Sequence, residues 1–233
     1  MRRHFAQTPH DASAEGYLWV SKDDQRQTTW DRRHGHTTTT KLRVVCKHCN
    51  ERWMSQMEVA ARPFIEPMLL GRPVTLRGSQ IETVAAWITL KMMIYDGQDQ
   101  REAVFTREET LRFKVDRQIP DFVRILVYKA KEPELRAYIA RAFANVSNVL
   151  DSMAVKSNIQ ATVFVVGRLV VLFVANRVPT INFNEPSQFQ AKRLWAPRNA
   201  TVVWPPIRLI NEDEVAKLAL ALRRFVQERG ILV

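Results

Sequence analysis

The apolar residues of the chain recur at helical spacing over residues 80–96, where they fall on one face of a helix with 3.6 residues per turn. This face is formed by Ile81, Val84, Ala85, Ile88, Met92 and Tyr95. The order Ser79-Gln80-Ile81-Glu82 is that of a capping box, in which a Ser hydroxyl and a Glu carboxylate accept backbone N–H groups at a helix start. Gly97 is suited to end the helix. The pattern therefore predicts a helix over 80–96.

Other segments show helical signals of different strength. A second capping box at residues 106–109 predicts a short helix that ends near Asp116. Residues 134–144 also fit a helical pattern. Residues 211–228 are amphipathic, acidic at the start and basic near the end, as the helix macrodipole favours, and Gly230 is expected to stop this helix.

The segment around the two cysteines predicts a strand followed by a helix. Residues 42–45 are a short β-branched run that ends in Cys46, which favours a strand. Asn50 is suited as the N-cap of the helix behind it. We expect Pro63 and Pro67 to kink or restart that helix, because a proline removes a backbone N–H donor.

Strand patterns dominate the second half of the chain. Residues 161–166 and 169–174 are two apolar runs separated by Gly167-Arg168, which predicts a β-hairpin. Residues 122–128 alternate as a strand, and residues 201–204 predict a short strand stopped by Pro205-Pro206. Because strands and helices do not alternate regularly, we expect an α+β fold. We divide it into a head over 1–71 and an α+β body over 72–233 with a C-terminal helix.

The charge balance points to an anionic partner. The chain carries 35 Lys and Arg against 24 Asp and Glu, a formal net charge of +11, which favours nucleic acid, although a solvated basic surface is the alternative. No apolar run approaches the length of a membrane span, and the first residues do not resemble a secretory signal. We therefore expect a cytoplasmic protein without a membrane partner.

The only two cysteines, Cys46 and Cys49, are separated by two residues, a spacing used for metal binding or for redox chemistry. Two thiolates are half of a tetrahedral Zn²⁺ site, and His34 and His36 are candidates to complete it as a His₂Cys₂ set. The redox alternative uses the same pair, with His48 between the thiols helping to lower a pKa. Arg43, Lys47, Asn50 and Arg52 flank the pair and are the candidate nucleic-acid contacts.

The motif at 46–58, CKHCNERWMSQME, resembles the second knuckle of bacterial and phage HNH-type endonucleases, a zinc-knuckle family with a ββα-metal site. The family reads Cys-x-x-Cys-Asn, two residues, Trp-Met-Ser and then a Leu/Met-Glu pair. The resemblance continues towards the C-terminus at Ala61-Arg62-Pro63, Glu66-Pro67, Leu69-Leu70-Gly71, Ala86-Trp87, Lys91, Arg193–Pro197 and Trp204-Pro205-Pro206.

The resemblance implies a nuclease that acts on nucleic acid, DNA first, by metal-dependent phosphodiester hydrolysis. A structural Zn²⁺ would pin the knuckle, and Mg²⁺ or Mn²⁺ would serve catalysis. The family opens with an earlier Cys-x-x-Cys and an acidic-His-x-x-Pro stretch, whereas this sequence has no earlier cysteine and no Glu-His or Asp-His pair. We therefore expect an incomplete catalytic head, by a misassigned start or a natural truncation, and assign no catalytic residue. The alternatives are a non-catalytic nucleic-acid- or protein-binding module and a thiol oxidoreductase acting through Cys46 and Cys49.

Overall fold

A computed structural model of the chain gives the fold. The residues that the structure describes are 15–18, 30–33, 44–97, 103–131, 138–144, 157–181, 191–195 and 201–229. His34, His36 and Arg43 lie outside them.

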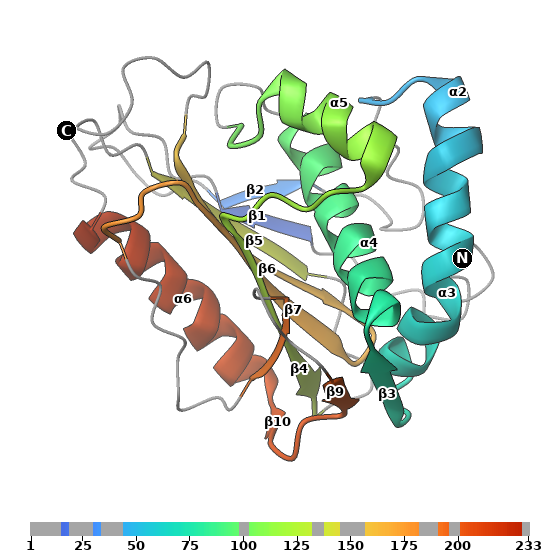
Figure 1. Cartoon of the computed structure of the whole chain (residues 1–233). Helices are drawn as coiled ribbons and strands as arrows, with labels where there is room; N and C mark the ends of the chain where they lie inside the picture. Colours follow the sequence, from blue (N-terminus) through green and yellow to red (C-terminus); the bar gives the residue numbers. More distant parts are fainter. Residues whose placement is uncertain are drawn as a thin grey trace.

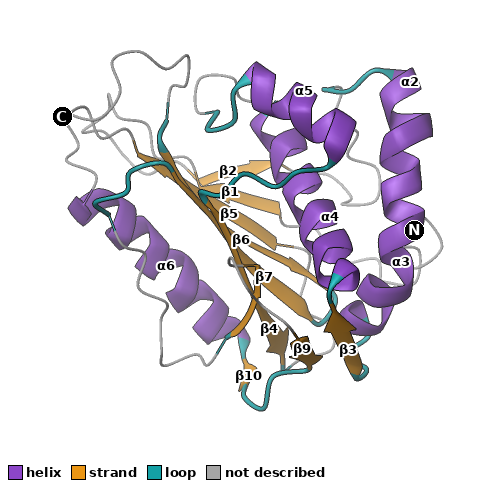
Figure 2. Ribbon diagram, in the orientation of Figure 1, coloured by secondary structure: helices purple, strands orange, loops and turns teal. Residues whose placement is uncertain are grey.

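A six-stranded sheet forms the centre of the molecule (Figures 1 and 2). Its strands, in the order β10-β4-β7-β6-β5 with β8 also paired to β4, are β4 (Val123–Ala130), β5 (Tyr138–Ala144), β6 (Ile159–Val166), β7 (Leu169–Asn176), β8 (Lys192–Trp195) and β10 (Leu209–Ile210). All pairs are antiparallel except β10 with β4. Two small antiparallel pairs are separate from this sheet: β1 (Glu15–Leu18) with β2 (Trp30–Arg33), and β3 (Val74–Arg77) with β9 (Thr201–Trp204).

Helices cover both faces of the sheet, which gives three layers (Figure 1). One face is covered by α3 (Ser55–Leu69), α4 (Ser79–Asp96) and α5 (Arg107–Asp116), and the other by α6 (Glu212–Arg229). The first helix starts as α2 (Lys47–Cys49), passes through a π-helical turn at Asn50–Met54 and continues without a break into α3.

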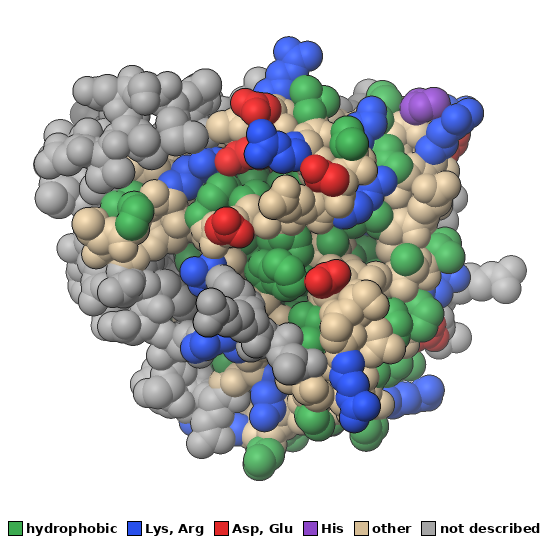
Figure 3. Space-filling view, in the orientation of Figure 1, with side chains coloured by type: hydrophobic (Ala, Val, Ile, Leu, Met, Phe, Trp, Pro, Cys, Tyr) green, Lys and Arg blue, Asp and Glu red, His purple; other side chains and the backbone are tan. Residues whose placement is uncertain are grey.

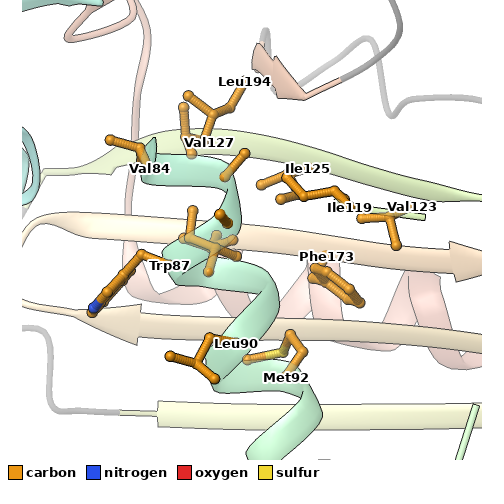
Figure 4. Close-up of a cluster of buried hydrophobic side chains, with 14 of the residues drawn as sticks. Val84, Trp87, Leu90, Met92, Ile119, Val123, Ile125, Val127, Phe173 and Leu194 are labelled. Atoms are coloured by element: carbon orange, nitrogen blue, oxygen red, sulfur yellow. The ribbon is translucent and has the colours of Figure 1, made fainter. Parts of the chain in front are cut away.

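Each face of the sheet has its own apolar core. The larger cluster joins α3 and α4 to the sheet, and Figure 4 shows Val84, Trp87, Leu90 and Met92 of α4 among side chains of the strands. The smaller cluster includes Tyr128, Leu172 and Val174 of the sheet with Val215 and Leu218 of α6. β6 and β7 are buried on both faces, and β7 accordingly reads as a continuous apolar run up to Asn176, whereas β6 also buries the polar Gln160 and Thr162. The larger cluster contains residues from both sides of the boundary expected after residue 71, for example Met68 and Val84.

The mixture of helices and antiparallel strands confirms the α+β class. The hairpin over Gly167-Arg168, the strands at 122–128 and 201–204, and the helices at 80–96, 106–116 and 211–228 are confirmed, with ends shifted by one or two residues. Thr106 caps α5 with a full capping box. None of the helices within the described residues is long and apolar enough to cross a membrane.

The helix predicted for 134–144 is wrong over 138–144, which form β5. This segment pairs with β6 along its whole length and buries Ile139, Ala142 and Phe143. Burial and strand pairing therefore outweigh the local helical preference of an Ala-rich segment.

The expected details of two helix starts are also wrong. Ser79 makes no capping bond, because Gly78 is the N-cap of α4, and the Gln80 side chain instead accepts the Arg77 N–H. Asn50 lies inside the first helix, whose N-cap is Cys46. Residues 44–45 form a turn and a bend in place of the end of a strand. Pro63 and Pro67 lie within one continuous α3 and do not restart it.

The C-terminal end of α3 docks on the β6–β7 hairpin. The Arg168 N–H donates to the Leu69 carbonyl at 2.9 Å, and Lys129 Nζ donates to the Gly71 carbonyl at 2.9 Å. Gly71 and Gly167 both have positive φ, a region open to glycine at little cost. These contacts satisfy carbonyl groups that the end of a helix leaves without an internal partner.

Candidate functional site

The cysteine pair lies at the N-terminal end of the first helix, at the upper right of Figure 1, where α2 is labelled. Cys46 has extended backbone angles and Cys49 is already helical. The Cys49 backbone N–H donates to Cys46 Sγ over 3.3 Å. Cys46 thus caps the start of the helix, because its thiol accepts the backbone N–H of Cys49.

The environment of Cys46 favours its thiolate. The pKa of the Cys46 thiol is lowered chiefly by the hydrogen bond from the Cys49 backbone N–H and by the Cys49 side chain, with smaller contributions from Lys114 and the backbone of His48. Both cysteines are free thiols, Cys46 exposed and Cys49 half-buried. An accessible thiol with a lowered pKa is suited to metal binding and to thiol exchange.

The donor set fits one half of a zinc site. Thiolates are preferred Zn²⁺ ligands, and a structural site takes four donors. Within the part of the chain that the structure describes, no group of three or more His, Cys, Asp or Glu side chains is arranged to hold a metal. A complete site therefore needs donors from other residues, for which His34 and His36 are the sequence-based candidates.

The predicted nucleic-acid contacts that the structure describes are exposed near the thiols. Lys47, Asn50 and Arg52 are all exposed, and Lys47 forms an ion pair with Glu51 one turn along the helix at 3.9 Å. Such a surface pair contributes little stability, so its lysine can exchange Glu51 for another anion. His48 is exposed as well.

The fold also brings in residues of α5 that the sequence did not indicate. Arg117, in a left-handed conformation at the end of α5, places its guanidinium 4.5 Å from the centre of the Trp53 ring, a cation–π contact. Lys114 of the same helix acts on Cys46 electrostatically. These residues follow Trp53 by about 60 positions, and no local pattern could relate them to the cysteines.

The two helices that carry most of the resemblance, α3 and α4, are in contact through an ion pair. Glu58 of α3 forms an ion pair with Lys91 of α4, and Lys91 Nζ lies 5.4 Å from the centre of the Trp87 ring. Trp87 itself is buried in the core. The ion pair links α3 to α4, whose apolar side chains pack together in the larger core cluster.

Comparison of the chain with protein-family models, with curated proteins and with solved structures found no match. The functional assignment therefore rests on the residues themselves.

Proposed function

We propose that the protein is an HNH-endonuclease-type, zinc-binding protein that acts on DNA. The observation that carries the proposal is the placement of two free thiols at one helix start, with the thiol of Cys46 accepting the Cys49 N–H. A hydrogen bond to sulfur favours the thiolate, which is the form that binds zinc. The resemblance of residues 46–58 to the second knuckle of that family supports the same assignment.

In this proposal Cys46 and Cys49 supply two of four zinc ligands, and His34 and His36 supply the others. Zinc held in this way is structural and would tie the N-terminal segment to the helix start. The exposed Lys47 and Arg52, together with Arg43, contact phosphates. Hydrolysis would require Mg²⁺ or Mn²⁺ to stabilise the leaving oxyanion, and we assign no general base.

A zinc assay tests the metal part of the proposal. The purified wild-type chain is expected to contain about one zinc per chain, as a single closed site requires. The Cys46→Ser and Cys49→Ser variants lose this zinc, and a variant with both His34→Asn and His36→Asn loses it as well. His48→Asn is the matched control, because His48 lies between the cysteines in sequence but is not one of the proposed ligands. Equal zinc content in all variants would contradict the proposal.

A plasmid assay tests the enzymatic part. With Mg²⁺ or Mn²⁺, nicking of supercoiled DNA that is abolished by EDTA establishes a nuclease. DNA binding without nicking, with a salt-dependent Kd, establishes the binding module in its place.

The lowered pKa and exposure of Cys46 also favour a second candidate, thiol–disulfide exchange through Cys46 and Cys49. Reduction of a model disulfide at a rate that falls in Cys46→Ser, by a chain that binds no zinc, would establish the oxidoreductase.

A further inference from the structure

Several segments that carry cationic residues end at the side of the molecule opposite α2, near the labels β3, β9 and β10 in Figure 1. We call these cationic residues the basic rim. It consists of Arg72 after α3, Lys129 and Lys131 at the end of β4, Arg168 in the β6–β7 turn and Lys192 of β8. None of these residues carries the resemblance or belongs to the knuckle.

The rim is organised around Gly71. Lys129 Nζ donates to the Gly71 carbonyl at 2.9 Å. A Cβ atom at Gly71 would lie 2.5 Å from Cδ of Arg168 and 2.9 Å from Cε of Lys129. The side chains of Arg168 and Lys129 therefore both pack against Gly71. Arg72 directly follows Gly71 in the sequence.

Strand register and chain position place the other two lysines near the end of β4. Lys192 is directly opposite Val127 in the antiparallel pair of β8 with β4. Opposite residues share a face, and so do residues two apart on a strand, so Lys192 and Lys129 lie on the same face of the sheet. Lys131 follows β4, and its N–H donates to the Ile210 carbonyl at 2.8 Å.

The rim is not neutralised from within the described part of the chain. Lys91, Arg141, Arg177 and Arg208 each form an ion pair with a carboxylate, but no rim side chain does so among the described residues. In Figure 3 Lys and Arg side chains line the lower edge of the visible face, and the acidic side chains lie mostly above them.

Lys129 has an evident structural role, but this role does not explain the other cations of the basic rim. Lys129 binds a carbonyl at the C-terminal end of α3, where the helix macrodipole favours a cation. That bond uses one of three ammonium donors and explains one side chain. Like charges repel one another over a Debye length of about 10 Å, so cations as close as Lys129 and Arg168 at Gly71 are best stabilised by an external anion.

We propose that the basic rim binds the phosphate backbone of a nucleic acid duplex. The proposal rests on the nucleic-acid partner of the proposed function, and it is independent of zinc and of the cysteines. Cations on β4 and β8, in the hairpin turn and in the segment after α3 suit a row of phosphates, and the formal net charge of +11 favours the same partner. Ile207, which is 95% exposed just before β10, makes an anionic lipid surface the competing partner.

The test compares two triple variants of the full chain with the same reduction in charge. Arg72→Gln/Lys131→Gln/Lys192→Gln removes rim cations but keeps Lys129 and Arg168, which contact the end of α3. Arg62→Gln/Arg107→Gln/Lys217→Gln removes exposed cations of α3, α5 and α6 and is the matched control. Each Kd for a labelled DNA duplex is measured by fluorescence anisotropy between 50 and 300 mM NaCl (roughly the range in which phosphate contacts control affinity). Thermal melts establish that each variant is folded, and Arg72→Gln alone is used if the triple variant melts early.

The expected result is a Kd at least about tenfold higher for the rim variant, with a salt slope lower by up to about 0.9 for each phosphate that the variant no longer neutralises. The control keeps a slope close to that of the wild type. Equal weakening of both variants overturns the rim and leaves the proposed function standing, whereas no duplex binding by the wild type overturns the proposed function and the rim together. Rim-dependent sedimentation with phosphatidylserine vesicles, combined with unchanged duplex binding, overturns the rim in favour of a lipid surface.

Discussion

Asp96 and Arg141 form the most deeply buried ion pair among the described residues, with side chains 4% and 7% exposed. Asp96 accepts the backbone N–H groups of Val104 and Phe105. In the orientation that satisfies both its ends, the Gln160 amide donates to Asp96 Oδ1 at 3.2 Å. Burial raises the pKa of the Asp96 carboxyl, and Arg141 and the two N–H groups oppose this rise. The network links the end of α4 to β5, β6 and the start of α5.

Removal of the Asp96 charge should be strongly destabilising. Asp96→Asn removes the carboxylate that pairs with the buried Arg141 guanidinium, and breaking a buried ion pair from one side costs about 3–5 kcal/mol of unfolding free energy. The control is Glu108→Gln, since Glu108 pairs with Arg112 on the exposed face of α5, and removal of such a pair costs about 0.5 kcal/mol or less. Urea unfolding measures both variants, and similar decreases would show that the buried network is not organised as described.

At the scale of single elements, helix starts depend on which side chain meets the free N–H groups. Thr106 and Glu109 satisfy each other's backbone N–H groups at the start of α5. Asn211 and Glu214 do the same at the start of α6. Ser79 and Glu82 have the same spacing, but α4 has Gly78 as its N-cap, because β3 leads directly into the helix and fixes the backbone there.

Alanine substitutions distinguish these starts. Thr106→Ala and Asn211→Ala should each lower the unfolding free energy by about 1 kcal/mol, the usual cost of losing an N-cap. Ser79→Ala should change it by less than about 0.5 kcal/mol, as expected of a surface position. Chemical denaturation of the three variants measures the difference, and a Ser79→Ala effect as large as the others would mean that the capping box predicted from sequence does form.

The pKa of Glu214 is lowered, first by the Asn211 backbone N–H and then by Arg208. Because the folded-state pKa lies below the unfolded one, the contribution of Glu214 is present above its unfolded pKa and disappears as the pH falls through the folded pKa. The contribution of the Glu214 carboxylate to this cap should therefore be lost in acid, whereas the bond that the Asn211 side chain accepts from the Glu214 N–H does not depend on pH.

At the scale of the whole molecule, the docking of α3 on the sheet depends on close backbone approach. A Cβ atom at Gly167 would lie 2.6 Å from the Leu69 carbonyl oxygen, whereas one at Gly78 would meet nothing within 4 Å. Both glycines have positive φ, so both substitutions carry the same kind of backbone strain, and only Gly167 adds a clash between elements.

Gly167→Ala should therefore destabilise the protein more than Gly78→Ala. Backbone strain at positive φ costs about 1–2 kcal/mol for alanine, and the clash at Gly167 should add at least about 1 kcal/mol, as forced shifts in packed structure do. Guanidinium unfolding of the two variants gives the comparison. Equal destabilisation would indicate that the hairpin and α3 separate easily and that their packing adds little stability.

Elements with local signals follow from the order of residues alone. The apolar periodicity of 80–96, the Thr106 capping box, and the two apolar runs around Gly167-Arg168 depend on side chains a few positions apart, and each formed as predicted. The sequence also indicated Cys46 and Cys49 as a pair, because their spacing is itself the geometric signal.

Features that depend on distant partners were set by the tertiary structure. Residues 138–144 became a strand because β6 offers backbone hydrogen bonds and burial that no local window contains. Cys46 became the helix cap in place of Asn50, and Lys114 and Arg117 reached the cysteine segment only through the packing of α5. The basic rim likewise draws Arg72, Lys129 and Arg168 from separate elements around one glycine, since the free energy of packing, rather than sequence spacing, brings them together.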